Sequence, residues 1–122
     1  DKRRPRPGQS KVMNIIGDVR GKTCIIVDDI IDSGGTIVNA VDALKKAGAT
    51  EVYVFITHAV LSGDAVSKIK KSKIKKLIIT DTIDNTVKIK NNSKIEVLSI
   101  AQLMAEAIKR ISNSTSVSDL FN

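Results

Sequence analysis

Runs of aliphatic residues alternate along the chain with stretches of helical spacing, and this alternation predicts the secondary structure. Four runs rich in Ile and Val predict strands, and the first two read as fully buried. These strands are expected at 22–29, 51–59, 75–83 and 94–100. Three segments with helical spacing or helix start signals are expected at 36–47, 62–72 and 100–111. We therefore expect an α/β domain with a mainly parallel sheet, flanking helices and right-handed crossovers.

Length and composition limit the class of protein. A chain of 122 residues supports one domain and one modest core, and its aliphatic content must supply that core because aromatic residues make up 2%. Cys24 is the single cysteine, so no internal disulfide forms, and we expect a reducing, cytoplasmic location. No apolar run approaches the roughly 20 residues of a membrane span. The opening residues lack an initiator Met and read like the middle of a longer protein.

The net charge of +7 is concentrated in two segments, 1–11 and 68–76. The second segment holds six lysines but no interleaved aromatic residue for base stacking. We interpret it as a solvated helix end and loop, and we expect no nucleic-acid partner. The first segment, by itself, would be interpreted as a disordered basic arm.

The stretch "IIVDDIIDSGGTI", residues 25–37, places three acids and a diglycine loop directly after the first predicted strand. Ligands of open α/β sheets bind beyond the carboxyl ends of the strands, where Asp28 and Asp29 are expected. Successive strand residues face opposite sides, so the two carboxylates have different roles. Carboxylates accept hydrogen bonds from sugar hydroxyls or share a metal ion.

The loop after these acids has the composition of a phosphate site. Two glycines permit turns that expose backbone N–H groups, and the following helix N-terminus adds positive potential. The loop residues are Asp32, Ser33, Gly34, Gly35 and Thr36. Phosphate next to an acceptor of paired hydroxyls indicates a pentose phosphate.

Three other interpretations of these residues are weaker. "DDIID" matches an Asp-Asp-x-x-Asp metal motif, but that motif needs a helix, and a β-branched strand precedes it here. "GDVRGKT", residues 17–23, resembles a Walker loop but has three residues between its glycines and leads into a strand. A buried strand with a polar turn would explain one Asp and one Gly, but not three acids and a diglycine.

"VDDIIDSGGT" resembles the phosphoribosyl-diphosphate signature of type I phosphoribosyltransferases and ribose-phosphate diphosphokinases. Four further segments resemble the diphosphokinases: "DKRRPRP", "VMNIIGDVRGKT", "THAVLSGDA" and "SVSDLF". The resemblance covers essentially the whole chain and implies a single, partial type I phosphoribosyltransferase-like domain. It corresponds to the later part of that enzyme, so strands that normally pair with those seen here would be missing, leaving an exposed edge.

The resemblance also implies roles for individual residues. Asp28 and Asp29 match the acids that face the ribose 2- and 3-hydroxyls, and 32–36 matches the 5-phosphate loop. Lys2 and Arg4 match a mobile catalytic arm, residues 1–11, that closes over ATP. Gly8 and Lys11 depart from the Asn and Glu that the family has there. Gly34 stands where many relatives have Ala, a change that the loop should accept.

In the family reaction the ribose 1-hydroxyl attacks the β-phosphorus of ATP, and AMP departs. Ribose 5-phosphate, ATP and Mg²⁺ are therefore the implied ligands, with the protein's metal ligands and ATP-binding residues upstream of this chain. A homo-oligomer is expected. Three residues of the tail, 112–122, match an allosteric site shared between subunits: Ser116, Ser118 and Phe121.

Some alternatives stay open at this point. The chain could be a non-catalytic regulatory homologue that binds sugar phosphate, or a phosphoribosyltransferase, although no base-binding segment is visible. His58, the only histidine, follows the second predicted strand. A single histidine is more often structural, although this position would also let it shape the ribose pocket.

Overall fold

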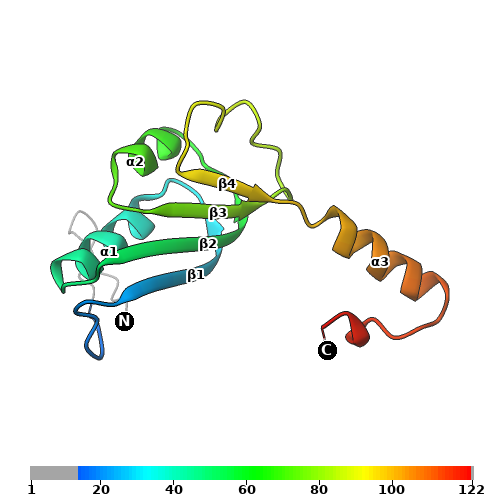
Figure 1. Cartoon of the computed structure of the whole chain (residues 1–122). Helices are drawn as coiled ribbons and strands as arrows, with labels where there is room; N and C mark the ends of the chain where they lie inside the picture. The colour runs from blue at the N-terminus through cyan, green and yellow to red at the C-terminus, as the bar shows by residue number, and fades with distance from the viewer. Residues whose placement is uncertain (1–13, 122) are drawn as a thin grey trace, which may run out of the picture.

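The computed structural model describes residues 14–121 and shows a parallel sheet with helices packed on one face (Figure 1). The elements follow one another in the order that the hydrophobic pattern predicts. They are β1 (Thr23–Ile31), α1 (Gly35–Lys46), β2 (Glu51–Ala59), α2 (Ala65–Lys71), β3 (Lys76–Thr80), β4 (Ile95–Leu98), α3 (Ala101–Ser112) and a 3₁₀ turn, η1 (Ser118–Phe121). The predicted α/β class with a parallel sheet is confirmed.

The sheet has the strand order β1-β2-β3-β4, and every neighbouring pair is parallel. Helices α1 and α2 connect the first three strands, whereas a stretch without helix or strand, residues 81–94, connects β3 to β4. All four strands therefore end at the same edge of the sheet. That edge receives the loops that follow β1, β2 and β3.

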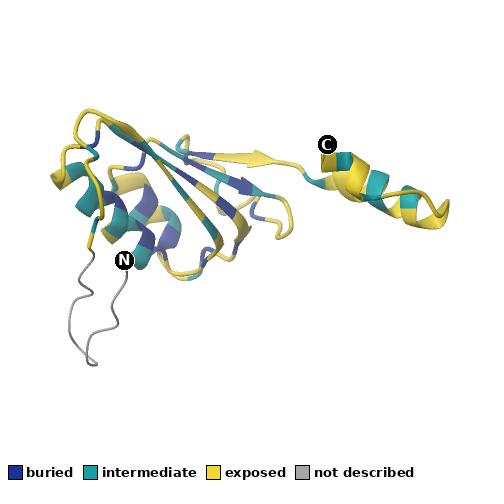
Figure 2. Cartoon of the chain, turned by 90° about the horizontal axis from the view of Figure 1, so that it is seen from below, coloured by how far each residue is buried: buried dark blue, intermediate teal, exposed yellow. Residues whose placement is uncertain are grey.

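The core lies between the sheet and the two helices α1 and α2, and Figure 2 shows buried positions concentrated there. Ile37 and Val41 of α1 and Ile69 of α2 face buried strand residues such as Val54 and Leu77. Removing these side chains from water supplies the main stabilising free energy of the domain. Gly48 follows α1 with φ of 102°, a left-handed conformation that commonly ends helices.

The prediction that β1 and β2 are fully buried is wrong, since both strands bury only one face. The open side is clearest in β1. Its residues alternate in exposure, and Ile25 and Val27 are 62% and 77% exposed. The reason is that β1 is an edge strand and that, within residues 14–121, no helix covers the second face of the sheet. Phe55 of β2 and Leu98 of β4 share this open face. An exposed edge agrees with what the resemblance implied.

The closing helix α3 leads away from the sheet (Figures 1 and 2). None of its residues is buried, although Leu103, Met104, Ile108 and Ile111 are apolar. Between residues 14 and 121, no helix is both long and apolar enough to cross a membrane. The basic arm, residues 1–11, lies outside the described residues.

Candidate functional site

The three acids of the signature lie at the carboxyl end of β1, but the strand is longer than predicted. Ile30 and Ile31 continue the pairing with β2 through His58 and Ala59, so the first two acids lie within the strand rather than at its last residues. Asp28 is half-buried, and its Oδ1 accepts a hydrogen bond of 2.9 Å from the backbone N–H of Asp29, which is exposed. The different burial of the two carboxyls agrees with the prediction that they face different surroundings.

The diglycine forms a sharp turn into α1. Gly34 adopts the left-handed conformation, with φ of 86° and ψ of −8°, and Gly35 is the first residue of the helix. The carbonyl of Gly34 accepts the first helical hydrogen bond, 3.0 Å from Val38 N. A left-handed residue at a helix N-terminus turns successive amides toward one point, and the helix dipole makes that point attractive to an anion. We call residues 32–36 the cradle, and their role as a phosphate site stays a prediction.

The next loop along the chain holds this cradle in place. The carbonyl of Ile31 accepts hydrogen bonds of 2.9 Å and 3.3 Å from Val60 N and Leu61 N. The carbonyl of Asp32 accepts one of 3.0 Å from Ser62 N. These bonds tie the start of the acidic loop to the segment between β2 and α2. The loop is thus positioned by the sheet and not only by its own sequence.

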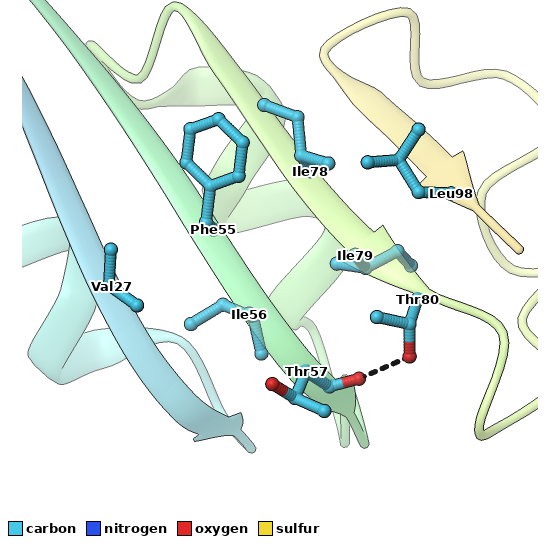
Figure 3. Close-up of a pocket in the computed structure, with 8 residues that line it drawn as sticks. All are labelled: Val27, Phe55, Ile56, Thr57, Ile78, Ile79, Thr80 and Leu98. Atoms are coloured by element: carbon cyan, nitrogen blue, oxygen red, sulfur yellow. Dashed lines mark hydrogen bonds between the residues drawn. The ribbon is translucent and has the colours of Figure 1, made fainter. Parts of the chain in front are cut away.

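A hydroxyl network joins the carboxyl ends of β2 and β3. Thr80 Oγ1 donates to the carbonyl of Thr57 at 2.6 Å, as Figure 3 shows, and Thr82 Oγ1 lies 3.3 Å from the same carbonyl. His58 Nδ1 lies 2.9 Å from Thr82 Oγ1. Sequence reasoning missed the two threonines because they were assigned to a longer third strand. Hydroxyl residues after an apolar strand were the available signal.

One carboxylate of this edge has a shifted pKa. The Ser99 hydroxyl and the N–H of Ile100 donate to Asp81, the second at 2.9 Å, and they hold the pKa of that carboxyl below its usual value. Asp81 thereby joins the end of β3 to the start of α3. It does not belong to the acids of the signature.

The open sheet face carries a hollow of about 210 Å³, drawn in Figure 3. Its lining is apolar apart from Thr57 and Thr80, and it includes none of the signature acids or glycines. An apolar lining without cations does not suit a sugar phosphate. The predicted site residues lie at the strand ends and not in this hollow.

No group of three or more His, Cys, Asp or Glu side chains among residues 14–121 is arranged to hold a metal ion.

Comparison with known proteins identifies the family. The family model described as "Phosphoribosyl synthetase-associated domain" matches residues 4–122. The chain belongs to this family. Among curated proteins it is 56% identical over 122 residues to a ribose-phosphate pyrophosphokinase of Agrobacterium fabrum and 57% identical to one of Bradyrhizobium diazoefficiens. The predicted resemblance to ribose-phosphate diphosphokinases, an equivalent name, is confirmed.

The matches cover all of this chain but only 39% and 38% of those two relatives. The crystal structure of phosphoribosylpyrophosphate synthetase from Mycobacterium smegmatis superimposes with a TM-score of 0.77 and 41% sequence identity. That match covers 81% of this chain and 33% of the solved chain. The phosphoribosyl synthetase family member described here thus spans about two-fifths of the length of its curated relatives. Its placement in their later part stays a prediction.

The predicted site residues fall into three groups. The structure brings the acids and the cradle, 28–36, together at one edge of the sheet. Lys2 and Arg4 lie outside the described residues. The tail residues lie beyond α3, where Ser116 Oγ is 2.7 Å from Ser118 Oγ and Phe121 is 72% exposed. Their allosteric role stays a prediction.

Proposed function

We propose that this chain supplies the ribose 5-phosphate site of a ribose-phosphate diphosphokinase. One observation carries the proposal: the left-handed Gly34 turn leads into the N-terminus of α1 directly after the acids of β1. The cradle attracts the dianionic 5-phosphate. Asp28 and Asp29 lie on the adjoining strand, where carboxylate oxygens can accept hydrogen bonds from the ribose 2- and 3-hydroxyls.

The reaction proposed for the whole protein joins this acceptor to ATP. The ribose 1-hydroxyl forms a new bond to the β-phosphorus, the bond from that phosphorus to the bridging oxygen of AMP breaks, and the hydroxyl proton is released. Negative charge spreads over phosphoryl oxygens in the transition state, and Lys2 and Arg4 of the arm would stabilise it. Mg²⁺ would enter with ATP and neutralise its phosphates. The acids of this chain orient the sugar so that its 1-hydroxyl meets the β-phosphorus in line.

Oligomeric assembly and a cytoplasmic location belong to the same proposal. The second face of the sheet and the apolar residues of α3 are exposed. Exposed apolar surface of this kind is typical of a protein–protein interface, here with another part of a larger protein or with a second subunit.

AMP release measures the proposed activity. The 122-residue chain should bind ribose 5-phosphate but release no AMP from ATP above background, because the described residues offer no donor site. Adding the part of the Agrobacterium fabrum relative that this chain does not match, in cis or as a second polypeptide, should restore turnover.

Lys2→Ala should abolish this turnover without weakening sugar phosphate binding. AMP release by the isolated chain would place the ATP site within it, contrary to the proposal. A reconstituted protein that binds sugar phosphate but never releases AMP would favour the regulatory homologue, for which the departures at Gly8 and Lys11 would give a reason.

A further inference from the structure

His58 lies beside the proposed sugar site rather than in the core. It is exposed and is the register partner of Ile30, the residue that follows Asp29 on β1. Neighbouring strands are about 4.8 Å apart, so the backbone of His58 lies one strand spacing from Ile30, next to Asp29. The edge that it occupies is the one that receives the cradle loop.

The ring is held through only one of its nitrogens. Nδ1 pairs with Thr82 Oγ1 at 2.9 Å, and Thr82 is itself anchored near the Thr57 carbonyl and Thr80 Oγ1, at 3.3 Å and 3.4 Å. Nε2 makes no hydrogen bond to any residue between 14 and 121. A side chain fixed at one nitrogen with the other left for solvent is preorganised for a ligand.

We propose that His58 Nε2 hydrogen-bonds a ring hydroxyl of bound ribose 5-phosphate, and that Thr82 is the positioning residue for the imidazole. This inference rests on the proposed function. A hydroxyl suits either tautomer because it both donates and accepts, whereas a phosphate oxygen would require a proton on Nε2. The contact is therefore to the sugar and not to the 5-phosphate, which the cradle of 32–36 binds.

A purely structural role for His58 would be to tie β2 to the segment after β3. Two amide side chains separate this role from the proposed one. The amide of His58→Asn lies where Nδ1 was and can keep the bond to Thr82, but nothing reaches the position of Nε2. The amide of His58→Gln reaches that position, at the cost of the bond to Thr82.

Nitrogen NMR of the ring provides the direct test, with the amides of 33–36 as an internal reference. Ribose 5-phosphate should shift both the cradle amides and the Nε2 resonance of the wild-type chain. Inorganic phosphate should shift the cradle amides only. His58→Asn should weaken ribose 5-phosphate binding about 3- to 10-fold, the effect of one hydrogen bond, while its melting temperature stays close to the wild-type value. His58→Gln should bind within about threefold of wild type.

Three kinds of result would contradict one or both proposals. Cradle shifts without an Nε2 shift, or wild-type affinity in His58→Asn, would overturn the His58 contact and leave the proposed function intact. An Nε2 shift with inorganic phosphate alone would place the contact on the phosphate and contradict the proposal. No cradle shift with either ligand would reject the proposed function, and the His58 contact with it.

Discussion

The two faces of the sheet differ although the same strands build both. On one face α1 and α2 cover residues such as Val54, Leu77 and Ile79, which are 0–1% exposed. On the other, Ile25 and Val27 remain in contact with solvent in the described structure. The open face mixes apolar residues such as Ile25 and Val27 with polar ones such as Lys76 and Glu96, whereas the covered face is almost wholly apolar. Packing against α1 and α2 orders the covered face, whereas Asp29 of the proposed site lies on the same exposed side of β1 as Ile25 and Val27.

The largest expected effect on stability comes from making the same substitution, Ile to Ala, on each face of the sheet. Ile79→Ala removes a fully buried side chain of β3 and should lower the free energy of unfolding by about 2–5 kcal/mol. Ile25→Ala, on the open face of β1, should cost less than about 1 kcal/mol, mostly from lost strand propensity. Urea denaturation of both variants measures this difference.

If Ile79→Ala leaves no folded protein, Ile79→Val provides the comparison, with an expected loss of about 0.5–1.5 kcal/mol. Equal losses in the Ile25 and Ile79 variants would mean that the open face is covered in solution, for instance by a second copy of the chain.

The cradle itself offers a matched pair of glycines. Gly34→Ala should destabilise the chain by about 1–2 kcal/mol because φ is 86°, although the added Cβ would sit 3.8 Å from Ala65 without a clash. Gly35→Ala meets no atom within 4 Å and lies in the helix, so stability should be unchanged or rise by up to about 1 kcal/mol. Thermal melting of the two variants is the measurement. Equal melting temperatures would contradict the left-handed turn on which the phosphate cradle depends.

Removing α3 should have a smaller effect on the sheet. Helix α3 has no buried residue, so a chain ending at Ile100 should unfold within about 0.5 kcal/mol of the full chain. Differential scanning calorimetry would detect a larger change. A marked fall in melting temperature would show that α3 packs on the open face in solution, and the contrast between the two faces would disappear.

The smallest expected effect is a pH-dependent loosening of the contact between Asp81 and the start of α3. Because hydrogen bonds from Ser99 and Ile100 lower the pKa of Asp81 below 3.8, its contribution to anchoring α3 is present above that pH. The contribution is lost as the pH falls through the lowered pKa of the folded chain. The amide resonance of Ile100 should therefore titrate below pH 3.8, and Asp81→Asn should remove that transition. An unchanged titration in the variant would assign the effect to another group.

Local sequence predicted the strands and helices well where the spacing of hydrophobic residues gave a clear signal. Strand β2 occupies the predicted residues 51–59, and α1 is displaced by one residue from its prediction. The acids and glycines of the signature also lie together as predicted, because they are close in the sequence. Strand propensity alone could not show that β1 is an edge strand, since that depends on which neighbours are present.

Contacts between distant residues were not predictable in the same way. His58 and Thr82 are 24 residues apart, and their pairing depends on the register of β2 and β3. Asn85 is buried and donates to the carbonyl of Ala59 at 2.8 Å, so a polar residue of an irregular segment became part of the interior. Neither contact could be predicted from a periodic pattern of residues in the sequence. Both follow from how the loops meet at the carboxyl edge of the sheet.

The proposed ribose 5-phosphate site lies at residues 28–36, at the carboxyl edge of the sheet. Amide chemical-shift mapping of the 122-residue chain tests it most directly, with ribose 5-phosphate and unphosphorylated ribose as ligands. Ribose 5-phosphate should move the amides of 33–36 more than any others, and ribose far less, because the cradle acts on the anion. Asp28→Asn keeps an oxygen for the N–H of Asp29, so it should fold normally yet bind about 10-fold or more weakly. If the largest shifts fall on the lysine run, 68–76, the anion binds there and not at the cradle.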